Sequence, residues 1–329
     1  MGRLSTKSEL LRLLETRRPQ VLSGAEAAAQ LGVSRAAVWK AAQSLRGEGH
    51  LVEAVAGKGY RLAQDSDVVT AEALDVLMAA PKAPVRVYDE VDSTNRVAKS
   101  WAMEGAPHGS WVVARRQTAG RGRLGRSFAS PPGGLYLSMV LRPGQGVQEP
   151  GLVTSAAAVA VCRAVAGLYG IELGIKWVND LFLSGKKCCG ILTEAATDME
   201  SGAVDHLVVG IGLDVTTTDA DLGEEVSEIA TSLFPGGGVP GGTARLAAEI
   251  HRQVLALFGA LPNRDFLAEY RARSTVLGRP VTVLATPPYR AQAVAIDDEA
   301  RLVVRTQAGE QRRLAWGEIS VRPEEQDLF

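Results

Sequence analysis

The sequence predicts an α/β (α+β) protein with three successive parts. Apolar residues at helical spacing dominate residues 1–65, which predicts a winged helix-turn-helix domain. Long apolar strands and single helices follow one another without a regular βαβ alternation over residues 70–275, which predicts a mixed sheet covered by helices. Five short alternating strands within residues 276–329 predict a small β-barrel.

Charge is local rather than global in this chain. The 329 residues hold 36 Lys and Arg against 37 Asp and Glu, so the surface as a whole does not favour a polyanionic partner. Residues 1–65 nevertheless carry ten basic and six acidic residues, and residues 111–130 carry five arginines and no acid. An anionic ligand or a nucleic acid is therefore expected at one of these two stretches.

Targeting and metal-binding signals are absent from the sequence. The N-terminus has no apolar leader segment, and no run reaches the roughly 18 apolar residues of a membrane span. Three cysteines and four scattered histidines form neither a disulfide framework nor a CxxC or HxxxH metal-binding pattern. We expect a cytoplasmic protein with no membrane association and no structural metal.

The first part reads as three helices and a hairpin. Residues 7–18 have apolar side chains at helical spacing, and Pro19 ends this helix. Residues 23–49 predict two further helices joined by a turn at Gly32, with Ser34 as the N-cap of the second. The β-hairpin that follows completes the winged helix-turn-helix pattern.

One face of the third predicted helix indicates DNA recognition. Arg35, Trp39, Gln43 and Arg46 share this face. Arginine and glutamine are side chains that read base edges, and the hairpin tip carries a lysine. Trp39 is unexpected on such a face, and packing against the first helix is its alternative position. A purely structural three-helix unit is the alternative for the whole domain. The DNA-contacting candidates are Ser34, Arg35, Trp39, Lys40, Gln43 and Lys58.

The polar residues 63–69 predict a linker to the central part. There, strands are predicted at 85–91, 110–117, 135–142, 172–177, 180–183, 188–195 and 206–215, and helices at 94–104, 151–170, 243–261 and 264–274. This irregular order favours an antiparallel-rich sheet over a doubly wound one. The glycine-rich residues 235–242 predict a surface loop to which no further role is assigned.

The segment GRGRLGRSF, residues 120–128, predicts an anion-binding loop. Glycines without a Cβ let the backbone approach a ligand closely. The arginines between them supply forked donors for carboxylate and phosphate. A disordered RNA-binding segment is the alternative. The position of the segment between two predicted strands favours an ordered enzyme loop that closes over its ligand.

Three further stretches of the central part carry polar or basic side chains. DSTN (92–95) places hydroxyl and amide groups at a helix start, where backbone N–H groups point outward. KWVND (176–180) ends a strand on an amide and a carboxylate, and GKKCCGIL (185–192) leads two lysines into a strand. Each alone fits an ordinary helix cap or surface turn, but their combination with the arginine loop is far more specific.

The motifs DSTN, QxxGRGRxGR, KWxND, KKxxGIL and GIG, in this order, resemble those of biotin protein ligases. With the winged helix in front and WGEIS (316–320) near the C-terminus, the chain resembles the bifunctional form that also represses biotin genes. The resemblance implies a class-II-synthetase-like central sheet and an SH3-like C-terminal barrel. It also implies that biotin and ATP form biotinyl-5′-AMP, from which biotin passes to a lysine of the biotin carboxyl carrier protein of acetyl-CoA carboxylase.

The same resemblance implies roles for individual residues. Lys187 and Arg121 would be the catalytic cations. The biotin-binding residues would be Ser93, Thr94, Asn95, Gln117, Gly120, Arg121, Gly122, Arg123 and Lys187. The nucleotide-binding residues would be Arg123, Arg126, Phe128, Asn179, Asp180, Lys187, Gly210 and Gly212. Mg²⁺ is expected with the triphosphate, with Asp180 as a contributor, and a homodimer is expected on operator DNA when biotinyl-AMP is bound.

Three residues depart from the pattern common in these ligases. Val178 stands where proline is usual, Phe128 where tryptophan is usual, and Asp214 where asparagine is usual. A smaller ring would stack less strongly over adenine, and an acid that faced the phosphates would repel them. The Phe128 and Asp214 departures support one alternative, a biotin-sensing transcription factor with weak or no ligase activity. A ligase for another acid such as lipoate, on a related fold, is a second alternative.

Overall fold

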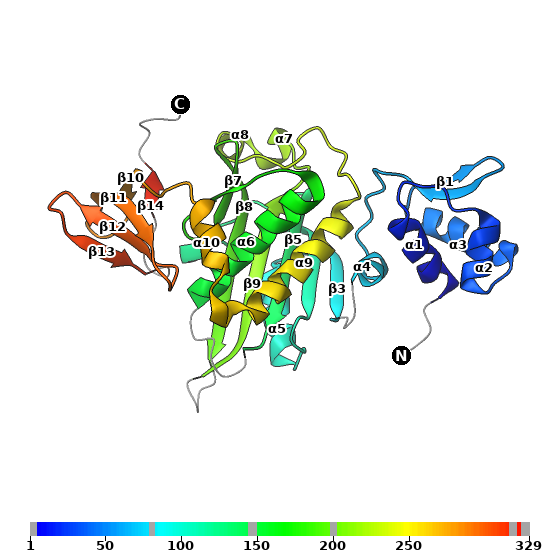
Figure 1. The fold of residues 1–329 in the computed structure, drawn as a ribbon, viewed down its shortest axis with the longest axis horizontal. Helices are drawn as coiled ribbons and strands as arrows, with labels where there is room; N and C mark the ends of the chain where they lie inside the picture. Colours follow the sequence, from blue (N-terminus) through cyan, green and yellow to red (C-terminus); the bar gives the residue numbers. More distant parts are fainter. Residues whose placement is uncertain (1–4, 79–82, 144–149, 198–202, 316–320, 324–329) are drawn as a thin grey trace.

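The computed structural model describes residues 5–78, 83–143, 150–197, 203–315 and 321–323. Three units follow one another along the longest axis of the molecule (Figure 1). An N-terminal helical unit is followed by a central sheet with helices and then by a C-terminal unit of strands. This arrangement confirms the predicted α/β fold class.

The N-terminal unit is the predicted winged helix-turn-helix. Its elements are α1 (Thr6–Thr16), α2 (Gly24–Leu31), α3 (Arg35–Gly47), β1 (Val52–Val55) and β2 (Gly59–Leu62). Gly32 ends α2 in the left-handed region, with a φ of 64°. The Ser34 hydroxyl accepts a hydrogen bond from the backbone N–H of Ala37 and so caps α3, as predicted.

Trp39 lies on the surface of α3 rather than against α1. Its side chain is 52 % exposed. Smaller aliphatic side chains already fill the core between the helices, among them Leu10, Leu14, Val38 and Leu45. An indole ring packed between α3 and the first helix would be buried, so this alternative position is wrong.

The central unit is built on a seven-stranded sheet in the order β3-β4-β5-β9-β8-β7-β6. Its strands are β3 (Val85–Val91), β4 (Trp111–Gln117), β5 (Gly134–Leu141), β6 (Gly174–Lys176), β7 (Asp180–Leu183), β8 (Lys186–Thr197) and β9 (Val204–Asp214). Among the described strands of this sheet, β3 and β4 form the one parallel pair. The antiparallel-rich sheet is thus confirmed.

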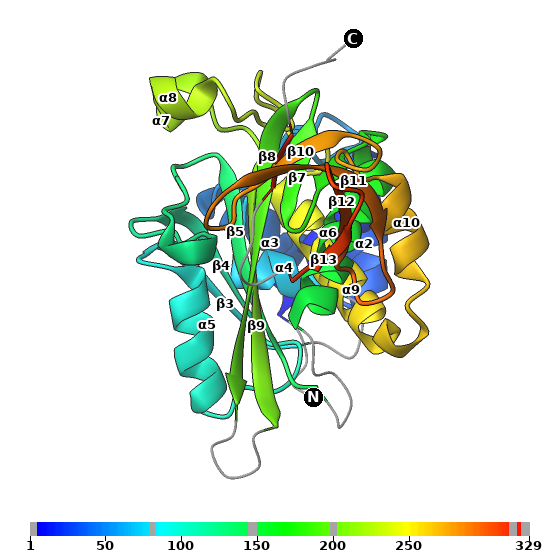
Figure 2. The same ribbon diagram turned by 90° about the vertical axis from the view of Figure 1, so that its left-hand side faces the viewer.

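Helices cover both faces of this sheet (Figure 2). On one face, α5 (Thr94–Met103) packs against β4, β5 and β9. On the other, α6 (Pro150–Tyr169) and α9 (Thr243–Gly259) pack against each other and against the sheet, and α10 (Phe266–Ala272) contacts α6.

Helix α6 corrects the expectation that no segment is long enough to span a membrane. Its 20 residues meet that criterion by length and composition. However, 78 % of its most apolar window is buried inside the protein, and α6 packs against both α9 and the strand β8. These contacts make α6 a core helix of the central unit.

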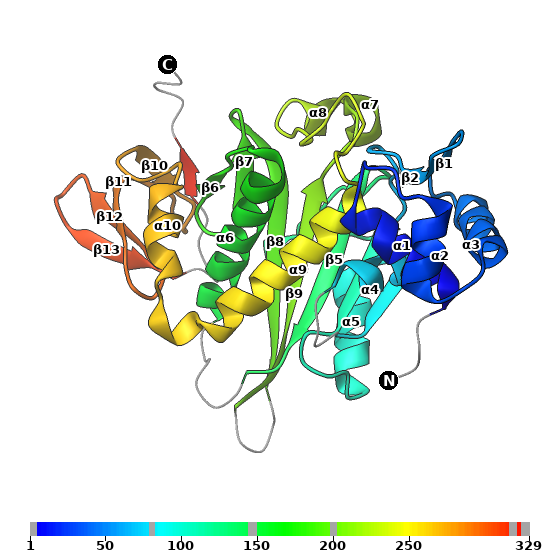
Figure 3. The ribbon, with the colours of Figure 1, turned by 45° about the vertical axis from the view of Figure 1, so that its right-hand side comes forward.

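The sequence did not predict three short helices: α4 (Ala71–Leu77), α7 (Asp219–Leu222) and α8 (Glu224–Ser227). Helix α4 packs against both α1 and α9, and so lies between the first two units (Figure 3). Helix α7 begins with a capping box formed by Thr218 and Asp221, which is a signal that the sequence does contain.

The C-terminal unit is an antiparallel sheet in the order β13-β12-β11-β10-β14. Its strands are β10 (Pro280–Val283), β11 (Tyr289–Ile296), β12 (Leu302–Thr306), β13 (Gln311–Leu314) and β14 (Val321–Pro323). Five strands are confirmed, although the end strands β13 and β14 do not pair with each other in the described residues. The WGEIS motif (316–320) lies outside the described residues.

A buried arginine joins the N-terminal and central units. Arg18 follows α1, and its side chain is 1 % exposed. Its guanidinium donates hydrogen bonds to the backbone carbonyls of Ala63, Ser66 and Gly241, and that to Gly241 measures 2.6 Å. The carboxylate of Glu15 lies 3.3 Å from it. One side chain therefore connects α1, the linker and the glycine-rich loop.

The linker is also bonded to α9. Asp67 accepts hydrogen bonds from the backbone N–H of Thr243 at 2.7 Å and from its hydroxyl at 2.8 Å. The N-cap residue of α9 is Gly242, which has no side chain, so Asp67 caps the helix in its place. The loop 235–242 thus ends at a contact between units, for which the sequence holds no signal.

Candidate functional site

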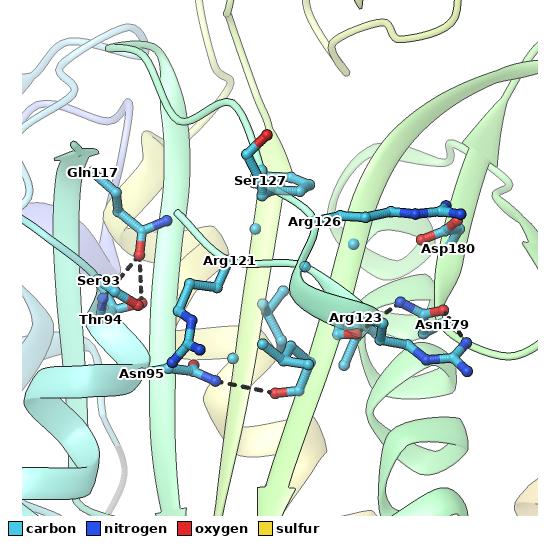
Figure 4. A pocket seen from close by; sticks show the side chains of 18 of the residues that line it. Ser93, Thr94, Asn95, Gln117, Arg121, Arg123, Arg126, Ser127, Asn179 and Asp180 are labelled. Carbon is cyan, nitrogen blue, oxygen red and sulfur yellow. Dashed lines mark hydrogen bonds between the residues drawn. The ribbon is translucent and has the colours of Figure 1, made fainter. Parts of the chain in front are cut away.

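A cavity lies over the middle of the seven-stranded sheet, beside the loop 120–128 (Figure 4). Its lining comes from the start of α5, the end of β4, the loop itself and the strands β7 to β9. Every predicted biotin- or nucleotide-contacting residue lines it except Gly120. The lining residues that the sequence did not reveal are Leu124, Ser127, Gly190, Ile191, Leu192 and Ile211.

Gly120 shapes the loop rather than the cavity. Its carbonyl accepts a hydrogen bond of 2.9 Å from the backbone N–H of Phe128. A Cβ at this position would lie 2.3 Å from the carbonyl oxygen of Phe128 and 2.5 Å from the Ser130 hydroxyl. Glycine is therefore needed for the base of the loop to close on itself.

Three glycines make part of the cavity wall from bare backbone. Gly190 of β8 pairs with Gly212 of β9, and Gly210 lies two residues before Gly212 on the same face. The Phe128 ring covers Gly190 and Gly212. A Cβ added at Gly212 would lie 2.5 Å from this ring, and a Cβ added at Gly190 would lie 2.9 Å from it. A Cβ at Gly210 would lie 2.0 Å from Oδ1 of Asn95. Because these three residues carry no side chain, the cavity reaches down to the sheet backbone here and forms a slot between Phe128 and Asn95.

The polar end of the cavity is held by a hydrogen-bond network at the start of α5. The Gln117 carbonyl oxygen accepts from the Thr94 backbone N–H at 2.8 Å, and its amide donates to Ser130 at 2.9 Å. The Asn95 amide donates to Glu194 at 2.8 Å, and its oxygen accepts from Ser138 at 2.6 Å. These side chains are therefore oriented without a ligand.

Ser93 differs from its neighbours at this end of the cavity. It is the N-cap residue of α5, but its hydroxyl makes no capping bond. The residue is 2 % exposed, and its hydroxyl makes no hydrogen bond with any residue that the structure describes. A hydroxyl that faces a cavity and makes no hydrogen bond to the surrounding protein is suited to a polar ligand.

A β-bulge turns Lys187 into the cavity. Lys187 and Gly190 are three residues apart and would point to opposite faces of a regular strand. The register between β7 and β8 shifts here: Leu181 pairs with Cys189, whereas Phe182 pairs with Lys187. The shift brings the Lys187 ammonium to 2.6 Å from the carboxylate of Asp180, which pairs with Gly190.

The arginines of the loop point in different directions (Figure 4). Arg121 extends toward Asn95, whereas Arg123 and Arg126 extend toward Asn179 and Asp180. A hydrogen bond of 3.1 Å joins the Arg123 guanidinium to the Asn179 side-chain oxygen. Burial lowers the pKa of Arg123 from its usual value. The loop therefore carries cations to both ends of the cavity.

Asp214 does not line the cavity. It lies two residues beyond Gly212 on the same face of β9, but it is 4 % exposed and its nearest side-chain partner is Thr217, at 3.5 Å. Burial raises the pKa of its carboxyl to about 7. An acid enclosed in this way is not part of the cavity surface, which removes the argument from Asp214 for an inactive sensor.

Replacing Asp214 by asparagine is expected to stabilise the fold increasingly as the pH rises from 5 to 8. The folded pKa of about 7 lies above the unfolded value of about 4, so the native state alone holds this proton between them. Wild-type stability falls as pH rises through that window, and the amide removes this loss. Thermal unfolding of both proteins at pH 5 and 8 checks the expectation, and an equal difference at both pH values would contradict it.

The predicted DNA-contacting residues are all exposed. Arg35, Trp39, Lys40 and Gln43 are exposed on α3, whose buried face is formed by Val38, Ala41, Ala42 and Leu45. Ser34 is exposed at the start of this helix, and Lys58 is exposed at the turn between β1 and β2. The helix and the hairpin thus each expose basic side chains, as the helix and wing of winged DNA-binding domains do.

No group of three His, Cys, Asp or Glu side chains able to hold a metal ion occurs among the described residues. Asp180 is the carboxylate that lines the cavity in this part of the chain, and Lys187 neutralises it. A divalent cation here would need most of its ligands from the oxygens of a bound molecule.

Comparison with known families matches three consecutive segments of the chain. Residues 87–214 match the Biotin/lipoate A/B protein ligase family. Residues 6–61 match an HTH domain, and residues 276–322 match the Biotin protein ligase C terminal domain. The cavity lies within the first of these segments, and helix α3 lies within the second.

Individual relatives match the chain over most of its length. The Bifunctional ligase/repressor BirA of Bacillus spizizenii is 34 % identical over 93 % of this chain and 96 % of its own length. The protein of the same name from Escherichia coli is 30 % identical over 92 % of this chain and 94 % of its own. A structure of biotin protein ligase from Aquifex aeolicus in complex with biotin and ATP superposes with a TM-score of 0.64 at 27 % identity, covering 73 % of this chain and 99 % of that one.

Proposed function

The chain belongs to the biotin protein ligase family in its bifunctional ligase/repressor form, and from this premise we propose how its residues divide the work. It is a ligase that uses ATP to attach biotin to protein, and its N-terminal domain is that of a DNA-binding repressor. The observation that carries the proposal is that a neutral polar network and a set of cations meet in one cavity.

The polar end of the cavity fits the ring system of biotin. A ureido group needs paired donors and acceptors but no charge. The Ser93 hydroxyl and the Gln117 N–H that is not bonded to Ser130 are left to supply them, while the Thr94 hydroxyl holds Gln117 in place. We assign the unpaired Ser93 hydroxyl to the ligand. Asn95 is partnered within the protein on both sides of its amide, so it acts through the shape of the slot. Gly122 and Arg121 close the slot from the loop side.

The cationic end fits the reaction between two anions. A carboxylate oxygen of biotin attacks the α-phosphorus of ATP, the bond to the pyrophosphate breaks, and biotinyl-5′-AMP remains. Lys187 and the loop arginines Arg121 and Arg123 offset the charge that builds up around the α-phosphate. Arg126 and Asn179, which line the same cavity, would face the nucleotide. Phe128, on the glycine wall, is placed for the adenine. Mg²⁺ bound with the triphosphate would neutralise its charge, with Asp180 as the protein ligand.

The second half-reaction needs no nucleophile from this chain. The amine of a lysine on the biotin carboxyl carrier protein attacks the carbonyl of the mixed anhydride, and AMP leaves. The test is to incubate the protein with MgATP, biotin and a recombinant carrier domain of acetyl-CoA carboxylase, and to weigh the carrier. A gain of one biotin is expected. An unchanged mass, or a gain with lipoate instead, would contradict the assigned substrate.

Replacing Arg123 by alanine is expected to make the adenylate escape at least about tenfold faster, since a charge-assisted hydrogen bond contributes about 1.5–3 kcal/mol. Its guanidinium reaches across the loop to Asn179 and closes this side of the cavity. The measurement is AMP release from preformed enzyme–adenylate without a carrier. Arg116→Ala is the matched control, because Arg116 forms an exposed ion pair with Glu90. Equal release from both variants would argue against the closure.

For the repressor half, we propose that biotinyl-AMP favours a homodimer that binds operator DNA in the cytoplasm. Two copies of α3 would then contact two half-sites. Ultracentrifugation with and without biotin and MgATP tests the dimer. A doubling of mass with both ligands is expected, and an unchanged mass would contradict the proposal.

A further inference from the structure

Trp39 is a large apolar side chain placed in a cationic surface. It lies on the exposed face of α3, with Arg35 one turn before it and Gln43 one turn after. Lys40, the next residue, is also exposed, and no residue of α3 is acidic. A single exposed tryptophan needs no explanation by itself. Its position between Arg35 and Gln43, in a row of basic and polar side chains, does need an explanation.

The local charge of the N-terminal unit indicates which kind of partner binds this row of side chains. Residues 1–65 carry four more basic than acidic residues, whereas the chain as a whole is nearly neutral. A surface with this local charge fits the phosphates of a DNA duplex better than it fits an average protein surface. In a helix-turn-helix, the second helix enters the major groove and its N-terminal residues contact base edges. Trp39 lies at the fifth position of α3, within that N-terminal half.

The chemistry of the indole ring limits what it can read there. It has one N–H donor and no acceptor, so it cannot form the bidentate pairs by which arginine or glutamine distinguish bases. It offers instead two wide apolar faces. Thymine is the base that presents an apolar group, its C5-methyl, in the major groove.

We propose that Trp39 recognises the C5-methyl group of a thymine in each operator half-site. This inference rests on the proposed repressor function. Contact removes both the indole face and the methyl group from water, and a methyl-sized group is worth about 0.8 kcal/mol, or about fourfold in affinity. The flanking Arg35, Lys40 and Gln43 would position the helix and read neighbouring bases.

The experiment uses the full chain with biotin and MgATP. A duplex is first selected from a random DNA library by this protein, and each thymine of the selected site is then replaced singly by deoxyuridine, which lacks only the methyl group. Wild-type protein is expected to lose about fourfold in affinity at one thymine per half-site. Trp39→Ala is expected to bind the selected duplex more weakly and to be indifferent to that same replacement.

Gln43→Ala is the matched control, because Gln43 lies on the same exposed row. It is expected to weaken binding while keeping the fourfold response to deoxyuridine. Thermal unfolding by circular dichroism shows whether each variant is folded. If every deoxyuridine replacement affects wild type and Trp39→Ala equally, the inference is overturned and the repressor function stands. If no duplex is enriched at all, the repressor function fails and the inference fails with it.

Discussion

Replacing Lys187 by alanine is expected to slow biotinyl-AMP formation by about two to three orders of magnitude, the usual effect of removing one group that stabilises transition-state charge. The bulge in β8 brings this ammonium to the face on which Asp180 and the glycine wall lie. No other lysine lines the cavity among the described residues. The measurement is the rate of pyrophosphate release at saturating biotin and MgATP.

The neighbouring lysine provides the control. Lys186 is exposed and donates a hydrogen bond of 2.8 Å to the backbone carbonyl of Ser227, away from the cavity. Lys186→Ala is expected to keep the wild-type rate. A wild-type rate in Lys187→Ala, or an equal loss of rate in both variants, would contradict the proposal that the Lys187 ammonium stabilises the transition state in the cavity.

Replacing Gly210 by alanine is expected to weaken biotin binding at least about tenfold and to cost about 1–3 kcal/mol of stability, as overpacking does. The added Cβ would lie 2.0 Å from Oδ1 of Asn95 and 2.8 Å from its Cγ. The Asn95 amide cannot move aside without breaking its hydrogen bonds to Ser138 and Glu194. Titration calorimetry with biotin and thermal unfolding measure the two effects.

Gly167→Ala is the matched control for this substitution. Gly167 lies exposed in α6, and a Cβ there would meet no atom within 4 Å. Alanine in a helix is about 0.5–1 kcal/mol more stable than glycine, so this variant should unfold slightly later and bind biotin normally. Unchanged biotin affinity in Gly210→Ala would mean that the slot can widen at Asn95.

The elements that the sequence predicts are those with long, unmixed patterns. The apolar runs of β5 and β9 and the 20 residues of α6 leave little choice of structure. Helix α4 has seven residues, and α7 and α8 have four each. Such segments hold too few periodic positions for a pattern to be recognised, and packing or a cap decides their structure instead.

The charged and amide side chains of the cavity are predicted, as are Gly122, Gly210 and Gly212, but some of the other lining residues are not. Gly190 and Ile211 line the cavity because of how β8 and β9 pair, and this register is not visible in either segment alone. The bulge that redirects Lys187 is a property of the same pairing. The burial of Asp214 is likewise a property of the folded strand, so its position outside the cavity lining could not be predicted.

The contacts of Arg18 and Asp67 set the spacing between DNA half-sites that the proposed homodimer can bind. Because Arg18 bonds α1 to the linker and to Gly241, and Asp67 caps α9, the linker holds the recognition helix at a set angle to the catalytic sheet. In the proposed homodimer, the distance between the two recognition helices would then be fixed by the folded protein and would not vary as it would with a flexible linker. An operator lengthened by a few base pairs between its half-sites should therefore lose affinity for the protein, even when every contacted base is unchanged.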